Sequence, residues 1–450
     1  MALPALLGAT LLGTLSNNIL NVPLRQITRA FHAPLSSGVL VVTSFVLVLA
    51  AAMAFTGWVG DRFGRRRTLI WALTLMAVAM VGAALAPSLP VLVALRAVQG
   101  LACAAIPPSV MGMLSSVYRP EQRARAMGAW AAANGVGQAV GPPVGGFLAD
   151  LWGWRSIFWV LVPMAVLALI AVVRGLPGDR GHATPLHWPG AACLTVGAAL
   201  TMTAATTVPQ SAVPVWVDVL LVSVGSLLLA LFVAVSNRAA HPLIRPRLIV
   251  ESRFIRSAVA SFAQMFALAT VLIAVPLYLT GEMGRTTAAT GLLVFALPAT
   301  MAVLAPGVGM LSDRIGSRRV LRAGLLVLAS ATVGLGYFTD GGARGLTLLV
   351  ALLIVVGAGV ALVQTPSATG ATRSPAGQIG SALGLFNMIR FGGSAVGAAW
   401  VAVIYPHGAL LLLFAGATFM LVIGLAVTFL GPDPLPARIG QRETQQITSA

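Results

Sequence analysis

Lysine is absent from this chain of 450 residues, so all 28 of its basic residues are arginine. A chain without lysine has no P-loop lysine for a nucleotide phosphate, no Schiff base with pyridoxal phosphate or retinal, and no lysine nucleophile. ATP hydrolysis by this chain is therefore not expected.

Charge is scarce altogether. Charged residues make up 9% of the chain and hydrophobic residues 58%, with a mean hydropathy of +0.93, whereas soluble domains carry about 25% charged residues. Apolar runs of about 20 residues, long enough to span a bilayer, recur from residue 5 to residue 429. The composition predicts an all-α polytopic membrane protein whose main partner is the lipid bilayer.

Residues that form disulfides or bind metals are also few. Cys103 and Cys193 both lie in apolar runs, and the five histidines are scattered without metal-ligand spacing. Neither a disulfide framework nor a zinc site is indicated, and we expect no metal and no cofactor. An enzyme within the membrane would need clustered His, Asp or Cys at membrane depth, so we do not expect an enzyme.

Fourteen apolar segments, each bounded by charged residues, proline or glycine, are candidate spans. They cover residues 4–24, 37–58, 69–86, 90–115, 126–149, 155–174, 188–208, 214–235, 256–281, 288–311, 321–338, 345–365, 380–403 and 408–430.

The arginines orient these spans. With the N-terminus inside, the inner loops and tail hold 21 arginines and the outer loops hold five. Cytoplasmic loops are the ones rich in basic residues, so we expect both termini in the cytoplasm and the protein in the plasma membrane. Because the arginines cluster in short loops between apolar runs, the net charge of +17 does not indicate nucleic-acid binding.

One motif occurs twice. Residues 57–67 and 309–319 both read G-x-x-x-D-R-x-G-x-R-R, after the second and tenth spans. Asp61 and Asp313 lie 252 residues apart, whereas six spans with their loops take only about 180 residues. The excess corresponds to two spans, which predicts two six-helix bundles with a two-helix insert between them.

With this repeat, the chain resembles the major facilitator superfamily, whose halves are parallel repeats, and within it the fourteen-spanner drug:proton antiporters. The resemblance divides the chain into a six-helix half (1–175), the insert with its flanking loops (176–254), a second six-helix half (255–431) and a cytoplasmic tail (432–450).

In that family, the repeated motif latches the two halves together in the outward-facing state. The paired glycines allow close helix approach and a tight turn, and an aspartate at a helix end accepts hydrogen bonds from arginines or from a neighbouring helix N-terminus. A basic loop that only signals topology is the alternative, but it requires neither the aspartate nor a second copy. The latch candidates are Gly57, Asp61, Arg62, Gly64, Arg65, Arg66, Gly309, Asp313, Arg314 and Gly316.

The fourth span contains L-x-x-x-R-x-x-Q-G, formed by Leu92, Arg96, Gln99 and Gly100, which resembles a second family motif. An arginine inside a span is functional by default and must face protein or water. The alternative is that Arg96 snorkels to the outer surface. We take Arg96, Gln99, Gly100 and the nearest acidic candidate, Asp150, as candidates for coupling transport to protons.

The fifth span matches the antiporter signature G-x-x-x-G-P-x-x-G-G. Its fixed positions are Gly137, Gly141, Pro142, Gly145 and Gly146. Small residues four apart let helices pack closely, and tandem prolines kink a helix. In the family this motif distinguishes exporters from importers; packing without any directional meaning is the alternative.

The first span departs from the family pattern. Members usually carry an acidic residue there, and Ser16 stands at that position. None of the eleven acidic residues falls in the middle of a predicted span, so an ordinary carboxylate proton relay is absent from the core. The same lack argues against recognition of cations by a buried carboxylate.

Polar side chains in spans 1, 5, 9, 12 and 13 could line a central cavity, although interhelical hydrogen bonding is the plainer role for each one alone. Arg390, in a segment N-x-x-R-x-x-G that resembles the family's span 13, is a second cation within the membrane. The cavity candidates are Asn17, Asn18, Asn21, Gln138, Gln264, Gln364, Asn387 and Arg390.

Together these features predict a secondary-active exporter of amphipathic or hydrophobic small molecules, driven by proton antiport and working by alternating access. The alternative is a facilitated or importing carrier of one metabolite; a receptor or an assembly scaffold would show no substrate flux. The partners expected are lipid, a small-molecule substrate and protons, in a monomer. The absence of lysine and the many Ala, Gly, Val and Pro residues are typical of a GC-rich bacterial genome.

Overall fold

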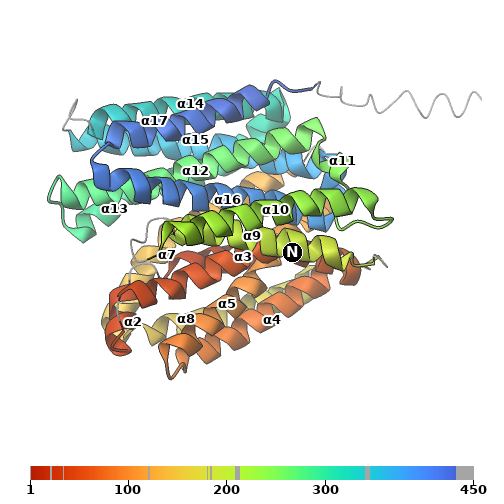
Figure 1. Ribbon diagram of the computed structural model, residues 1–450, viewed down its shortest axis with the longest axis horizontal. Coiled ribbons are helices and arrows are strands. Elements are labelled where there is room, and N and C mark those ends of the chain that lie inside the picture. Colours follow the sequence, from red (N-terminus) through yellow and green to blue (C-terminus); the bar gives the residue numbers. More distant parts are fainter. Residues whose placement is uncertain are drawn as a thin grey trace, which may run out of the picture.

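The computed structural model describes residues 2–20, 23–33, 35–119, 122–179, 181–182, 185–207, 213–339 and 345–431. These residues are almost entirely helical (Figure 1). The first group of helices comprises α1 (Ala2–Asn18), α2 (Leu24–Ala30), α3 (Leu35–Phe63), α4 (Arg65–Ala84), α5 (Leu89–Ala104), α6 (Ile106–Val117), α7 (Arg123–Trp152) and α8 (Arg155–Gly175).

The chain continues through a helical pair and then a second group. The pair is α9 (Trp188–Thr207) and α10 (Val215–Arg238), followed by the short α11 (Pro246–Ile249). The second group comprises α12 (Ser252–Gly281), α13 (Thr287–Ile315), α14 (Ser317–Tyr337), α15 (Leu346–Arg373), η2 (Pro375–Gln378), α16 (Gly380–Ile404), η3 (Tyr405–His407) and α17 (Leu410–Val427).

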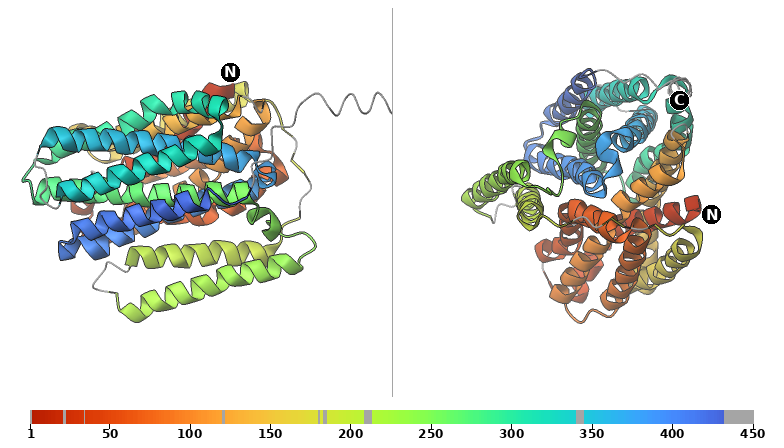
Figure 2. Two further views of the ribbon diagram at one scale, coloured as in Figure 1. Left: turned by 90° about the horizontal axis from the view of Figure 1, so that it is seen from above. Right: turned by 90° about the vertical axis from the view of Figure 1, so that its right-hand side faces the viewer.

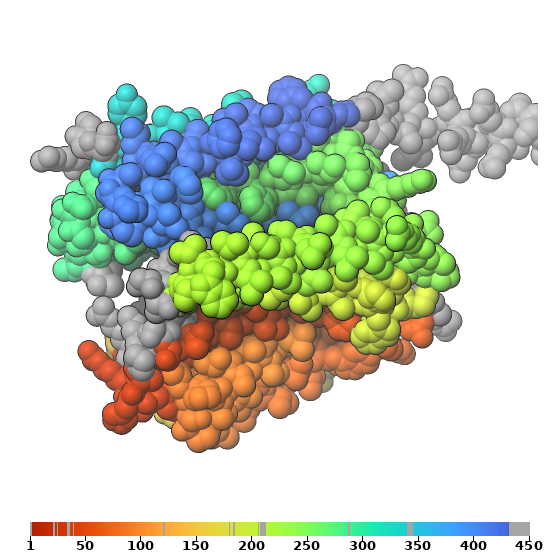
Figure 3. Space-filling view, viewed as in Figure 1, coloured from red at the N-terminus to blue at the C-terminus, as the bar shows by residue number. Residues whose placement is uncertain are grey.

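The two groups of helices stand side by side, with their helices roughly parallel (Figure 2). They meet along two seams, where α7 packs against α13 and α3 packs against α16. The pair α9–α10 lies outside the second seam because α9 contacts both α3 and α16. Figure 3 shows this pair on the surface between the two groups. The predicted limits of the halves and the insert remain a proposal.

Burial separates central helices from peripheral ones. In the most apolar stretch of α12, 78% of the residues are buried, whereas the corresponding value for α10 is 17%. The outer surface of α10 is apolar and includes Val215, Trp216, Leu220 and Leu227. Apolar side chains on the outside, with every helix satisfying its own backbone hydrogen bonds, are what a bilayer requires.

Twelve helices within the described residues are long and apolar enough to cross a membrane, counting α5 and α6 together as one span over Leu89–Val117. Two of the fourteen predicted spans fall outside that set. One is α1, which has 17 residues; the other is α7, which is rich in glycine and contains Asn134, Gln138 and two prolines. Length and composition therefore support twelve spans, and the count of fourteen is argued below as a proposal.

The predicted fourth span is broken in the structure. Helix α5 ends at Ala104 and α6 begins at Ile106, so the helix is interrupted at Ala105, whose backbone angles stay in the right-handed helical region. Pro107 and Pro108 lie in the first turn of α6. Proline lacks an N–H donor and clashes with the preceding helical turn, so it weakens a continuous helix and is accommodated best in a first turn. The break therefore follows from the two prolines.

The repeated motif makes the same turn twice. Gly64 separates α3 from α4 with φ of 92°, and Gly316 separates α13 from α14 with φ of 94°. Residues with a side chain rarely adopt this left-handed region, whereas glycine enters it freely. The two copies of the motif thus end one helix and start the next in the same way, at corresponding places in the two groups.

Candidate functional site

The first copy of the motif joins the two groups of helices. Asp61, near the end of α3, accepts hydrogen bonds at the start of α16 from the backbone N–H of Gly380 (2.8 Å to Oδ1 and 2.7 Å to Oδ2) and from that of Ser381 (3.3 Å). The first N–H groups of a helix have no partner within it and attract an anion. Asp61 therefore caps a helix that belongs to the other group.

Two further features hold this contact, which we call the Asp61 junction (Gly57, Asp61, Arg65, Gly380 and Ser381). Arg65 Nη2 lies 3.7 Å from Asp61 Oδ1 and donates to the Gln378 carbonyl oxygen at 3.0 Å. A Cβ on Gly57 would collide with the Gly380 carbonyl. The backbones of α3 and α16 thus touch where the carboxylate crosses.

The remaining motif residues around Asp61 lie outside the junction. Arg62 is exposed. Arg66 donates to the Val173 carbonyl oxygen at 2.5 Å, and its backbone N–H donates to Asp179 at 3.0 Å. Asp179 thereby caps α4, a role that sequence reasoning did not assign to it.

The second copy occupies the matching place at the other seam. A Cβ on Gly309 of α13 would approach Ala124 O to 2.6 Å and Arg125 Cα to 2.9 Å, at the start of α7. Asp313 pairs with Arg373 at 3.3 Å. The end of α13 thus meets the start of α7 as the end of α3 meets the start of α16. Both Asp313 and Arg314 are exposed.

Arg96 is the centre of a buried cluster. Its side chain is 1% exposed, so it does not snorkel to the surface. Its guanidinium donates to three acceptors: the Val41 carbonyl oxygen at 3.1 Å, the Ser16 carbonyl oxygen at 3.1 Å and Gln99 Oε1 at 2.7 Å. It also lies 4.2 Å from the centre of the Phe45 ring.

The rest of this motif completes the same tie. Gln99 Nε2 donates to the Ala79 carbonyl oxygen at 3.1 Å, and a Cβ on Gly100 would collide with the Phe45 carbonyl. The cluster therefore connects α5 to α1, α3 and α4. Asp150 is not part of it: this residue is exposed and accepts a hydrogen bond from Gln26 at 2.7 Å. The coupling candidate Asp150 thus does not contact Arg96, whose three acceptors are two backbone carbonyl oxygens and the side chain of Gln99.

The glycine motif of α7 faces α1. A Cβ on Gly137 would meet Thr14 Cβ at 2.7 Å, one on Gly141 would meet Asn18 Cβ at 3.1 Å, and one on Gly145 would collide with the Ile19 carbonyl. These glycines lie four residues apart, so they form one face of the helix. Pro142, Pro143 and Gly146 belong to the same helix. The opposite side of α7 packs against α13 through Gly128 and Gly135.

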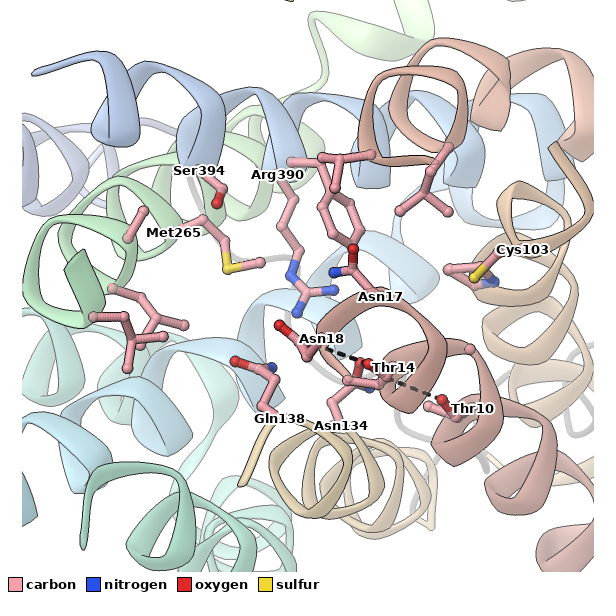
Figure 4. Close-up of a pocket in the computed structure, with 18 of the residues that line it drawn as sticks. Thr10, Thr14, Asn17, Asn18, Cys103, Asn134, Gln138, Met265, Arg390 and Ser394 are labelled. Atoms are coloured by element: carbon pink, nitrogen blue, oxygen red, sulfur yellow. Dashed lines mark hydrogen bonds between the residues drawn. The ribbon is translucent and has the colours of Figure 1, made fainter. Parts of the chain in front are cut away.

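A cavity of about 360 Å³ lies between the two groups of helices (Figure 4). Helices α1, α3, α5, α6 and α7 line it from the first group, and α12 and α16 line it from the second. Its polar lining residues are Thr10, Thr14, Asn17, Asn18, Asn134, Gln138, Arg390 and Ser394.

Four of the eight residues predicted to line a cavity do so: Asn17, Asn18, Gln138 and Arg390. Asn21 lies outside the described residues. The other three pack between helices: Gln264 is 0% exposed, Gln364 is 2% exposed, and Asn387 donates to the Leu383 carbonyl oxygen at 2.9 Å. On α12, the face that meets the cavity is the apolar one with Met265 and Leu268.

Several cavity residues were missed by the sequence analysis, among them Asn134 and Trp130. Asn134 accepts a hydrogen bond from Thr14 at 3.2 Å, and its position four residues before Gln138 places both on one helical face. That spacing was a usable signal. Trp130, one turn earlier, lies under Arg390, whose Cζ is 5.3 Å from the ring centre. An aromatic residue in an apolar span carries no comparable signal.

Comparison with known proteins decides the family. The family model described as Major Facilitator Superfamily matches residues 6–237 and 257–449. The chain belongs to the major facilitator superfamily. It is thus a multi-pass membrane transporter and not an enzyme, and the resemblance seen in its motifs is confirmed.

Curated relatives of this superfamily member include drug transporters. Over 408 residues it is 31% identical to the multidrug resistance protein Stp of Mycobacterium tuberculosis, covering 86% of this chain and 74% of that one. It is 30% identical over 394 residues to the drug efflux pump JefA of the same species, covering 86% and 76%.

A solved structure shares the fold. The human organic anion transporter MFSD10 (TETRAN) superimposes with a TM-score of 0.67 at 18% identity, covering 95% of this chain and 98% of that one. At this identity the likeness concerns the fold alone.

Proposed function

We propose that this superfamily member is a secondary-active exporter of amphipathic or hydrophobic small molecules, coupled to protons and working by alternating access as a monomer. Transport requires a binding site between two halves that rock about it. The cavity between the two groups of helices, lined from both, supplies such a site.

The position of the cavity relative to the Asp61 junction carries this proposal. On α3 the cavity is lined by Val42, Val46 and Leu49, and Asp61 follows Leu49 by twelve residues, which is about 18 Å along a helix. On α16, Arg390 follows Gly380 by ten residues, or about 15 Å. The halves are thus tied at one end of the bundle, and the cavity lies toward the other end.

The relatives support the direction of transport. Both M. tuberculosis proteins are named for drug resistance or drug efflux, and their similarity to this chain extends over most of its length. The glycine motif of α7, which distinguishes exporters in the resembling family, packs closely against a helix that lines the cavity.

We also propose fourteen spans, with both termini in the cytoplasm of a bacterial cell. Helices α1 and α7 pack against each other within the first group, so both lie inside the bundle. The 21 to 5 distribution of arginine supports an orientation with the Asp61 end in the cytoplasm.

Reporter fusions after Gly175 and after Ala239 test the insert, because two added spans return the chain to the same side. Both fusions should report the cytoplasm. Opposite locations would contradict the proposal.

A drug-susceptibility panel in a bacterial host that lacks its own pumps tests export. Expression of the protein should raise the inhibitory concentration of a subset of compounds, and Asp61→Asn at the same membrane level should not. A panel without any protected compound, at a verified membrane level of the protein, would contradict drug export.

One observation favours a second candidate. No Asp or Glu occurs among the described residues that line the cavity, so no carboxylate there can carry a coupling proton. This is what a facilitated or importing carrier of one metabolite would show. Everted vesicles with and without an imposed pH gradient separate the two, because only a coupled exporter accumulates substrate in response to the gradient.

A further inference from the structure

Arg390 is a buried cation that donates no hydrogen bond to the part of the chain that the structure describes. Its side chain is 2% exposed, it lines the cavity, and its Nε has no hydrogen-bond partner among the described residues. Figure 4 shows its guanidinium extending from α16 toward Asn17 and Asn18 of α1 and Gln138 of α7. Its Cζ lies over the faces of two rings, 5.3 Å from the centre of Trp130 and 5.5 Å from that of Phe391.

Arg96 provides the internal comparison. It is buried to the same degree, yet all three of its guanidinium nitrogens donate to protein acceptors. The burial of Arg96 is therefore explained by a structural role, because its hydrogen bonds connect helices. Buried donors ordinarily have acceptors. Arg390 has no comparable structural role, because its guanidinium faces the cavity.

The charge of the cavity lining is equally one-sided. Arg390 is the one charged side chain among its described residues, and none of them is acidic or a histidine. A charge at membrane depth needs a partner, and charged residues in spans commonly mark substrate or ion pathways. This arrangement of charge suits an anionic ligand.

The rest of the lining indicates the chemical character of the remainder of the ligand. Both groups of helices supply apolar lining: Leu268, Leu272 and Ile273 from α12, and Val42 and Val46 from α3. A flat carboxylate fits the planar fork of an arginine with two parallel hydrogen bonds, and the amides of Asn17, Asn18 and Gln138 supply further donors.

We propose that this cavity is a binding site for small amphipathic organic carboxylates. Arg390 binds the carboxylate, and the apolar body of the ligand lies between α3 and α12. Binding of the carboxylate does not depend on export; only its transport after binding rests on the proposed export function. It gives Arg390 a role in selecting the substrate by charge.

The test uses the purified full-length protein in lipid nanodiscs and three matched compounds: 4-cyclohexylbutyrate, its primary amide, and 4-cyclohexylbutylamine. Isothermal titration calorimetry measures their dissociation constants. The carboxylate should bind at least about tenfold more tightly than the amide, and the amine should bind most weakly because its charge opposes that of Arg390.

Two variants of Arg390 assign the preference to this side chain. Arg390→Gln should bind the carboxylate and the amide equally, and Arg390→Lys should keep part of the preference because the charge remains while the fork is lost. Arg285→Gln is the matched control, since Arg285 is exposed in the loop between α12 and α13, and it should behave as wild type.

Equal binding of the amide, or a preference that survives in Arg390→Gln, would overturn the proposal. So would the absence of carboxylate binding to the wild-type protein. The wild-type ranking decides even if Arg390→Gln fails to fold. Carboxylate binding that depends on Arg390 without flux in proteoliposomes would uphold this inference and contradict export. Drug export with no preference for anions would contradict this inference and uphold export.

Discussion

The guanidinium of Arg96 in α5 donates a hydrogen bond to the backbone carbonyl oxygen of Ser16 in α1, across 3.1 Å. Ser16 stands where the resembling antiporters usually carry an acidic residue. The arginine of the fourth-span motif therefore lies beside the position of the missing carboxylate, and a carbonyl oxygen accepts its hydrogen bond. This relationship makes Arg96 a structural tie in this chain.

The first prediction concerns that tie. Arg96→Ala should lower the free energy of unfolding by about 2–5 kcal/mol, as other large-to-alanine changes in cores do, because it leaves a void and Gln99 Oε1 without its donor. Arg96→Lys should lower it less. Thermal melts of the detergent-solubilised protein measure both. Transport per folded molecule should keep its wild-type pH dependence, since Asp150 lies outside the cluster; a shifted pH profile would contradict this account.

The second prediction restores the acidic residue. Ser16→Asp places a titratable group next to the Arg96 guanidinium, so transport should depend more steeply on an imposed pH gradient than in wild type. Ser16→Asn is the matched control because asparagine has nearly the same shape as aspartate but carries no charge. Equal responses of the two variants would show that position 16 has no part in coupling.

The third prediction compares the two copies of the repeated motif. Asp61→Asn weakens hydrogen bonds to a charged acceptor, each of which contributes about 1.5–3 kcal/mol, and so should depopulate the conformer closed at that end by about tenfold or more. Transport should fall by a similar factor while the amount of folded protein changes little. Asp313→Asn should have a smaller effect, because its ion pair with Arg373 is more exposed than that of Asp61 with Arg65: the side chains are 32% and 21% exposed in the first pair and 16% each in the second. Substrate flux per inserted molecule measures the difference, and equal flux in both variants would refute it.

The fourth prediction concerns the α1–α7 contact. Gly145→Ala should reduce folded protein severely, because its Cβ would collide with the backbone carbonyl of Ile19. Gly8→Ala in α1 is the control: nothing lies within 4 Å of a Cβ there, and alanine is the better helix former. The monodisperse fraction in size-exclusion chromatography reports the outcome. A well-folded Gly145→Ala variant would mean that the two helices do not pack this closely.

The features of this structure that could be predicted are those with a local signal in the sequence. Gly64 and Gly316 could be recognised as matching turns because the motif repeats, and α16 begins at Gly380 and ends at Ile404 beside the predicted limits of 380–403. The break at Ala105 was also visible in Pro107 and Pro108, although the predicted span ran through it.

The site was less predictable for a physical reason. Two of the three partners of Arg96 are backbone carbonyl oxygens, those of Ser16 and Val41, and a carbonyl is the same at every residue. A buried transporter helix is apolar on most sides, so no hydrophobic stripe indicates which face meets the cavity. Gln264 and Met265 are neighbours, yet only Met265 lines it.

The central claim is export from the cavity driven by a proton gradient. Everted membrane vesicles, acidified inside and supplied with a compound against which the protein confers resistance, test it most directly. Wild-type vesicles should accumulate the compound above equilibrium, a protonophore should abolish the accumulation, and Asp61→Asn vesicles should accumulate the compound about tenfold more slowly. Uptake that only reaches equilibrium, with or without the gradient, would contradict proton-coupled export and identify a facilitated carrier.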